Sequence, residues 1–445
     1  MPKGNVDYIC SECGTSSPMS LGRCPRCGSW GSMEPRAHAP ARRASGNGRA
    51  ATAAVQALAE VSEAELSRNS SGDEEVDRVL GGGWVSGSVL LLAGEPGIGK
   101  STLLLQLAHH AAAAAAERST LYVAGEESPA QVRLRAERLG VGQGVKVTRE
   151  TDARALAAYL RAEPPQLAIV DSIQTLLSED GATPGTLTQV RDSTALLVAA
   201  AKESGTTLVL IGHVTKQGSI AGPKVVEHMV DATLALESAA GFRVLRAIKN
   251  RFGPAGEMGV FEMAADGMRQ VPNPSQAFLS ERPLGVPGSV VTAALEGQRP
   301  LLLEVQALAA KSPYASPRRV VQGLDSRRVD VVLAVLERRL ELPLTGLDVF
   351  VNVAGGLRLT DPGTDLAVAL AVYSAVTNRT MPEGTAVVGE VGLAGELRTV
   401  PQLARRRTEA ARAGFDNVLE PSSDSPDARG CRSVREAIER AWSNE

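Results

Sequence analysis

The segment 88–117 limits the possible folds of this chain more than any other. It begins with the apolar run SVLLLAG (88–94), continues through GEPGIGKS (94–101), and ends in a stretch with helical character that is rich in Leu and Ala (101–117). A strand, a loop of the pattern GxxxxGK[ST] and a helix, in this order, are the context in which such a loop binds phosphate. The segment therefore predicts an α/β fold with a nucleotide site where this strand ends.

Each residue type in this loop has a chemical reason to be there. Glycine lets the backbone turn so that consecutive N–H groups and the positive end of the helix dipole face the phosphates. We expect Lys100 to reach the β and γ phosphates and the Ser101 hydroxyl to bind Mg²⁺. The predicted ATP site consists of Gly94, Glu95, Pro96, Gly97, Ile98, Gly99, Lys100, Ser101 and Thr102.

Two more apolar runs lead directly to carboxylates. The run QLAIVD (166–171) ends in Asp171, and TLYVAG (120–125) is followed by Glu126 and Glu127. Because ligands bind at the carboxyl ends of parallel strands, we expect Asp171 to be the second Mg²⁺ residue and one of the two glutamates to be the base that polarises the attacking water. The alternative for the glutamates is an acidic pair favoured by the dipole at the start of a helix.

A fourth apolar run, TTLVLIG (206–212), is followed by His213. We predict that His213 senses the γ phosphate and passes its presence to the next loop, although a simply packed histidine is the alternative. Strand-like and helical runs alternate from 56 to 270, which indicates βαβ units and a mostly parallel sheet covered on both faces.

Four cysteines near the N-terminus form two CxxC pairs. Cys10 and Cys13 are separated by ten residues from Cys24 and Cys27, a spacing that can place four thiolates around one ion. We predict a tetrahedral Zn²⁺ site whose metal supplies much of the folding free energy of this segment. Two redox-active pairs are the alternative, but these usually occur at the start of a helix in a βαβ unit, which the segment lacks.

The composition restricts possible partners. The 445 residues include 47 Lys plus Arg and 50 Asp plus Glu, a formal charge of −3, so a nucleic acid would have to bind local basic patches. Aromatic residues make up 3% of the chain, which disfavours a surface built mainly on base stacking. Without an apolar run long enough for a bilayer or a signal peptide, the sequence predicts a soluble, cytoplasmic protein with no membrane partner.

Composition shifts along the chain suggest five parts. The segment 271–287 contains four prolines, and after it runs such as LDVFVNV and DLAVALAVYSAV indicate a second α/β domain. The predicted parts are a four-cysteine zinc module (1–35), a linker rich in Ala, Arg, Gly and Ser (36–55), an ATPase domain (56–270), a second linker (271–287) and a C-terminal domain (288–445).

Several motifs taken together resemble the RadA (Sms) family of bacterial DNA-repair ATPases over nearly the whole chain. They are the two CxxC pairs, DRVLGGGWVSGSVLLLAGEPGIGKST (77–102), the tandem glutamates and KNRFG (249–253). The resemblance implies a RecA-like core that forms homo-hexameric rings on single-stranded and branched DNA, drives branch migration with ATP, and acts together with the recombinase RecA. It also implies that Lys249 and Arg251 act on a neighbouring subunit's nucleotide or on DNA, and that the loop from Lys216 to Lys224 faces DNA.

The C-terminal domain resembles the proteolytic domain of Lon, seen in LTDPGTDLAVALAVYSA and GEVGLAGELRTVPQLARRR. Where Lon has its nucleophilic serine, this chain has DPGTDL (361–366), and where Lon has its lysine, near Ala404, only arginines occur. An arginine stays protonated and cannot serve as the base of a Ser-Lys dyad, even with Thr364 as the nucleophile. We therefore expect a proteolytically inactive scaffold.

Basic residues of this domain are candidate DNA contacts, with a solvated charged face as the alternative. They are Lys311, Arg318, Arg319, Arg327, Arg328 and Arg405 to Arg407. The expected function is that of a DNA-dependent, Mg²⁺-dependent ATPase in recombinational repair. The alternatives are an ATP-switched scaffold that does not translocate, as in related clock and signalling ATPases, and, less favoured, an ATP-dependent protease.

Overall fold

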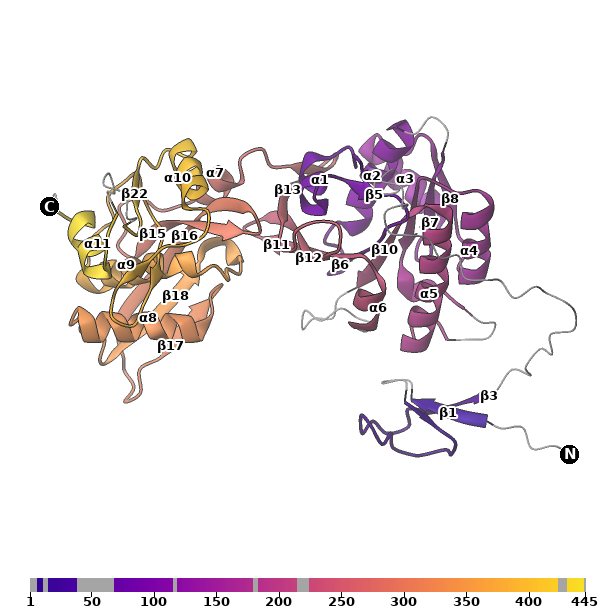
Figure 1. Ribbon diagram of the computed structural model, residues 1–445, viewed down its shortest axis with the longest axis horizontal. Helices are drawn as coiled ribbons and strands as arrows, with labels where there is room; N and C mark the ends of the chain where they lie inside the picture. The colour runs from indigo at the N-terminus through magenta and orange to yellow at the C-terminus, as the bar shows by residue number, and fades with distance from the viewer. Residues whose placement is uncertain are drawn as a thin grey trace, which may run out of the picture. The chain divides into compact units, whose positions relative to one another are not determined.

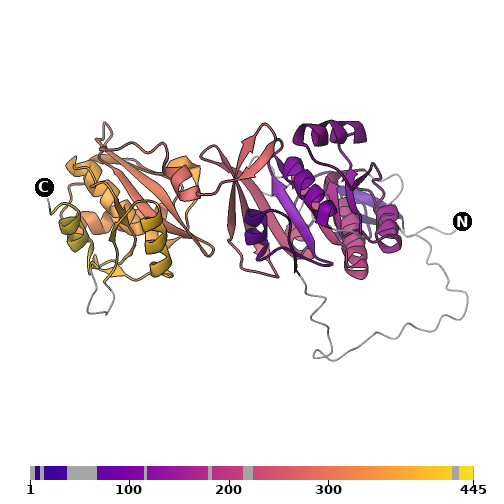
Figure 2. The ribbon, with the colours of Figure 1, turned by 90° about the horizontal axis from the view of Figure 1, so that it is seen from above.

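The computed structural model describes residues 6–10, 15–37, 68–114, 118–178, 183–213, 224–422 and 430–443. By internal contacts the chain divides into two compact units (Figures 1 and 2). The first comprises Met1–Leu236, Ala247–Gly253 and Ala265–Met268, and the second comprises Glu237–Arg246, Pro254–Ala264 and Arg269–Glu445. Among the described residues, none of the helices combines the length and apolar character that crossing a membrane requires.

The N-terminal module is a small antiparallel sheet in the strand order β2-β1-β3. Its strands are β1 (Val6–Cys10), β2 (Ser16–Ser17) and β3 (Met33–Ala37). Cys10, Cys24 and Met33 form its small buried cluster. Because so few apolar side chains are buried, the module needs a further source of folding free energy.

The parallel strands of the first unit, in the order β11-β6-β10-β9-β7-β8, belong to a nine-stranded sheet that continues beyond β11 with β12, β13 and β14. Its elements are β4 (Arg68–Asn69), α1 (Glu74–Leu80), β5 (Trp84–Val85), β6 (Val89–Gly94), α2 (Lys100–Ala114), β7 (Thr120–Ala124), α3 (Pro129–Leu139), β8 (Val145–Thr148), α4 (Ala153–Ala162), β9 (Leu167–Asp171), α5 (Leu187–Ser204), β10 (Thr207–His213), α6 (Lys224–Met229) and the start of β11 (Ala232–Ala239).

Both faces of this sheet are buried. Strands β6, β7 and β9 contain only buried residues, which is why they read as continuous apolar runs in the sequence. One face packs against α4 and α5, and α2 packs against β7 and β9. Because the strands are parallel, their carboxyl ends bring Gly94, Ala124, Asp171 and His213 to one edge of the sheet.

The second unit is built on a six-stranded sheet in the order β17-β18-β16-β15-β19-β22. Helices α8, α9 and α11 share one core cluster with it, and α7 and α10 contact β16 elsewhere. The remaining elements are β12 (Phe242–Asn250), β13 (Met258–Ala264), β14 (Gly267–Gln270), α7 (Pro274–Leu279), β15 (Ser289–Glu296), β16 (Arg299–Lys311), β17 (Arg319–Gln322), α8 (Ser326–Arg339), β18 (Leu347–Val353), α9 (Asp365–Thr377), β19 (Thr385–Val387), β20 (Glu390–Val391), β21 (Leu397–Arg398), α10 (Leu403–Arg412), β22 (Asn417–Leu419) and α11 (Val434–Ala441).

The division into compact units differs in detail from the predicted domain limits. Strands β11 and β12 each contribute residues to both units, whereas the sequence places a boundary near residue 270. The proline-rich segment 271–287 contains helix α7, whose N-cap is Asn273 and whose first residue is Pro274. Proline suits the first turn of a helix because its missing N–H has no partner there.

Candidate nucleotide site and its neighbours

The phosphate loop has the expected backbone geometry between β6 and α2. Gly97 and Gly99 adopt φ values of +77° and +116°, which other residues rarely adopt. Gly94 allows close packing, because a Cβ there would lie 2.6 Å from the Leu236 carbonyl oxygen. Lys100 is 4% exposed, and its Nζ donates to the carbonyl oxygens of Gly94 and Glu95 at 2.8 and 2.9 Å. Burial lowers the pKa of Lys100, opposed by the charges of Asp171 and Glu126.

A tyrosine lies beside both predicted Mg²⁺ residues. The Tyr122 hydroxyl on β7 donates to Asp171 Oδ2 at 2.6 Å, and the Ser101 side chain lies near it. Burial, and then the Asp171 charge, raises the pKa of Tyr122 well above its usual value, so the phenol stays protonated as a donor. A hydroxyl and a carboxylate gathered at one strand edge form an oxygen donor set of the kind that Mg²⁺ prefers.

Glu126 faces this site. Its Oε1 accepts hydrogen bonds from the Ser172 hydroxyl and from His213 Nε2, the latter at 2.9 Å, and His213 Nδ1 lies 3.4 Å from Lys100 Nζ. Burial acts to raise the pKa of Glu126, but hydrogen bonds from Ser172 and His213 and the charge of Lys100 outweigh it and lower the pKa. The carboxylate is therefore ionised near neutral pH, as a general base must be.

Glu127 has a different environment, although it is the next residue. Its Oε1 pairs with Arg135 of α3 at 2.5 Å. Glu127 Oε2 and Arg135 Nη1 are buried and have no hydrogen-bond partner among the described groups. The described contacts of Glu127 thus lie with α3, whereas Glu126 contacts His213 and Ser172.

The KNRFG segment is anchored within the first unit at the end of β12. Lys249 Nζ donates to the carbonyl oxygens of Glu227, within α6, and of Val230, directly after it, at 2.6 and 2.7 Å. Burial, and then the neighbouring Arg251, lowers the pKa of Lys249. Arg251 Nη1 pairs with the buried carboxylate of Asp231 at 3.1 Å. Of the two predicted DNA-facing lysines, Lys216 lies outside the described residues, and Lys224 is described only as the first residue of α6.

Three of the four predicted zinc ligands are brought together. The sulfurs of Cys10, Cys24 and Cys27 lie within 4.8 Å of one another, and those of Cys10 and Cys27 are 3.6 Å apart. Zn–S bonds of about 2.3 Å in a tetrahedron place sulfurs about 3.8 Å apart, so these thiols fit Zn²⁺. Cys13 lies outside the described residues.

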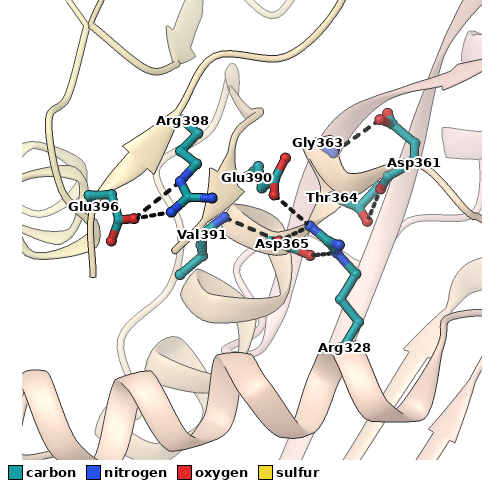
Figure 3. Close-up of polar contacts among 9 residues, drawn as sticks. All are labelled: Arg328, Asp361, Gly363, Thr364, Asp365, Glu390, Val391, Glu396 and Arg398. Atoms are coloured by element: carbon teal, nitrogen blue, oxygen red, sulfur yellow. Dashed lines mark hydrogen bonds and ion pairs between the residues drawn. The ribbon is translucent and has the colours of Figure 1, made fainter. Parts of the chain in front are cut away.

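The positions that correspond to the Lon dyad hold a threonine, drawn beside Asp361 in Figure 3, and a buried arginine. The Thr364 hydroxyl is buried and donates to the Asp361 carbonyl oxygen at 2.8 Å. Arg406, which is 0% exposed, pairs with the Asp361 carboxylate and also donates to the Ala293 carbonyl oxygen at 2.7 Å. A guanidinium held in this way cannot accept a proton from a hydroxyl.

The candidate DNA contacts of the second unit are not equivalent. Arg328 makes a bidentate pair with the buried Asp365, with distances of 2.6 and 2.7 Å, and lies 3.5 Å from Glu390 (Figure 3). Arg406 is fully buried, so it cannot reach a phosphate backbone. The other six are exposed: Lys311, Arg318, Arg319, Arg327, Arg405 and Arg407. Arg318 stacks on Tyr314, with its Cζ 4.1 Å from the ring centroid, and Arg407 pairs with Glu420.

Sequence reasoning missed three residues of these sites, Tyr122, Arg135 and Ser172, and it assigned Arg406 a contact with DNA that the burial of this side chain excludes. Tyr122 lies two residues before the end of β7, on the side of the strand opposite Val123, and reads as an ordinary core residue. Ser172 directly follows the predicted Mg²⁺ carboxylate, and this adjacency is the only sequence signal for it. Arg135 and Arg406 occur in arginine-rich helices, where the pattern alone indicates a solvated face.

The fold and the phosphate-loop geometry define a P-loop ATPase that carries an N-terminal zinc module and a C-terminal Lon-like domain. Three family models match the chain. They are described as "AAA domain" over residues 56–219, "Rubredoxin metal binding domain" over 8–35, and "Subunit ChlI of Mg-chelatase" over 320–424. The predicted fold class and the predicted ATP and Zn²⁺ cofactors are confirmed.

The chain belongs to the family of the DNA repair protein RadA. It is 46% identical to that protein of Pseudomonas aeruginosa over 434 residues, which cover 96% of this chain and 95% of the relative. It is 44% identical to the Escherichia coli protein, covering 94% and 93% of the two chains, and 43% identical to the Bacillus subtilis protein, covering 95% and 94%.

Proposed function

We propose that this protein couples ATP hydrolysis to branch migration of DNA intermediates during recombinational repair. The observation that carries the proposal is the position of His213. Its ring contacts both Lys100 and Glu126, and it is the last residue of β10, directly before the predicted DNA-facing segment. A residue that contacts the phosphate-binding lysine and the base can report nucleotide occupancy to the residues that follow it.

In this proposal Glu126, rather than Glu127, is the catalytic base. When bound, Mg²⁺-ATP supplies the phosphoryl group and neutralises charge at the phosphate oxygens. Glu126 orients the attacking water and accepts its proton, and Ser172 and His213 keep its carboxylate ionised and fixed. Lys100 exchanges the carbonyl oxygens of Gly94 and Glu95 for phosphate oxygens, which also changes its contact with His213.

The proposed partners are single-stranded and branched DNA, the recombinase RecA, and further copies of this chain in a homo-hexamer. The name of the relatives, DNA repair protein, supports DNA as a substrate. Arg251 supports a contact with DNA or with a neighbouring nucleotide, because its side chain is 49% exposed although it pairs with Asp231. Lys249 would act indirectly, by holding the end of α6.

We further propose that the Lon-like domain is a scaffold without peptidase activity. Its support is chemical: the Thr364 hydroxyl is committed to a carbonyl oxygen, and the nearby basic group, Arg406, is a buried and paired guanidinium. The described partners of Thr364 and Asp361 include no titratable amine that could act as a general base. Exposed basic residues such as Arg319 and Arg327 remain candidates for contact with the DNA backbone.

The rival function is an ATP-switched scaffold that binds DNA or proteins without moving. Glu126→Gln separates the two, because it keeps nucleotide binding and removes the base. In a branch migration assay on three-stranded intermediates, a motor requires the Glu126→Gln variant to bind DNA yet move no branch, while Glu127→Gln stays active. The scaffold instead predicts that the wild type also moves no branch, and movement by Glu126→Gln at the wild-type rate would contradict a motor driven by hydrolysis.

A further inference from the structure

Tyr122 is a fully buried polar side chain directly beside the nucleotide site. It is 1% exposed and comes from the middle of β7, whose neighbours in the sheet are β8 and β9. In the register of β7 with β9, Tyr122 is opposite Ile169 and Ala124 is opposite Asp171. The phenol therefore reaches forward along the sheet to the carboxylate at the end of the next strand, where it donates to Oδ2 at 2.6 Å.

The first turn of α2 also lies near this hydroxyl, because the side chain of Ser101, the other predicted Mg²⁺ residue, is close enough to affect the pKa of Tyr122. Tyr122 is therefore near two predicted Mg²⁺ residues from different elements, one at the start of α2 and one at the end of β9. A buried hydroxyl can satisfy its hydrogen bond with any nearby acceptor, but here the acceptor is a predicted metal-binding carboxylate.

We propose that Tyr122 is a positioning residue for Mg²⁺. This proposal rests on the proposed function of the ATPase site. The Tyr122 phenol holds the Asp171 carboxylate by one oxygen, which leaves the other oxygen for the metal or a metal-bound water. Groups that orient metal ligands in this way typically change metal affinity by about 10–100-fold when they are removed.

Tyr122→Phe tests this directly, because it removes only the hydroxyl and keeps the ring in the core. Binding of a fluorescent ATP analogue is measured with Mg²⁺ and with EDTA. The Kd in EDTA divided by the Kd with Mg²⁺ reports the contribution of the metal. We expect this ratio to fall about 10-fold or more in Tyr122→Phe, because the Kd with Mg²⁺ rises while the Kd in EDTA is unchanged. Tyr159→Phe is the matched control, because the described hydrogen-bond partner of its hydroxyl is Lys146, at 3.5 Å, rather than a predicted Mg²⁺ residue.

Two results would overturn the proposal. If the ratio in Tyr122→Phe equals that of the wild type, the phenol does not position the metal. If both Kd values rise equally, its role is to support the fold. Asp171→Asn provides the reference, since it should remove most of the Mg²⁺ dependence, and failure to do so also refutes the proposal. A wild-type protein that binds no nucleotide would instead refute the proposed function itself.

Discussion

Adjacent glutamates of one sequence motif have separate chemical environments in this protein. Glu126 contacts Ser172 and His213, while Glu127 pairs with Arg135. We therefore predict that Glu126→Gln lowers kcat for ATP hydrolysis by about 10²–10⁴-fold, the usual contribution of a general base. Glu127→Gln should keep most of the activity. Steady-state phosphate release measures both variants, and a larger loss in Glu127→Gln would reverse the assignment.

The hydrogen bond that Ser172 donates to Glu126 should affect how enzyme activity depends on pH. It lowers the pKa of Glu126, so the base stays ionised, and the enzyme stays active, to a lower pH than with an ordinary carboxyl. Ser172→Ala removes this effect, so the pKa rises and activity is lost at a higher pH as the solution is acidified. The acidic limb of the kcat/KM profile should therefore move toward neutral pH.

A suitable control for this shift is Ser193→Ala, because the Ser193 hydroxyl is buried but has no hydrogen-bond partner among the described groups. That variant should keep the wild-type limb. An unchanged limb in Ser172→Ala would show that this hydrogen bond does not tune the base.

At the scale of elements, the ion pair between Arg406 of α10 and Asp361 connects two segments of the second unit. Both side chains are almost completely buried. Removing one partner of such a pair leaves a buried charge unpaired, which costs about 3–5 kcal/mol. We expect Arg406→Met to lower the free energy of unfolding of this unit by that amount, measured by urea denaturation.

The matched substitution Arg412→Met should cost less than about 1 kcal/mol, because the Arg412 side chain is 73% exposed where it pairs with Glu409 on the same helix. Equal losses in the two variants would show that the buried pair has no special role. The double variant Asp361→Leu with Arg406→Met should recover stability, since no buried charge remains unpaired.

The sequence predicted those elements whose apolar residues form a clear local pattern. Strands β6, β7, β9 and β10 are continuous, mostly apolar runs, and helix α9 is also mostly apolar. The phosphate loop was readable because its residues are adjacent in sequence. The roles of Tyr122 and Arg406 could not be predicted in this way. Their partners, Asp171 and Asp361, are 49 and 45 residues away in the sequence, and a local pattern contains no information on such contacts.

At the scale of the whole molecule, the zinc module is distinguished by its own small sheet and a cluster of thiols. We predict one Zn²⁺ per chain, measured by atomic absorption. Because its buried apolar cluster is small, removal of the metal by a chelator should unfold residues 6–37 and expose them to protease, as mass spectrometry can map. ATP binding at Lys100 should persist. Protection of the metal-free module would contradict this account.

The most direct test of the whole account is ATP turnover with and without single-stranded DNA, in the wild type and in Lys100→Ala. The loss of Lys100 removes the charge that faces the phosphates, so that variant should show no turnover under either condition. The wild type should hydrolyse ATP faster when DNA is present, with a stimulation that weakens as salt is added. Turnover by Lys100→Ala, or a wild-type rate that ignores DNA at every salt concentration, would contradict the central claim.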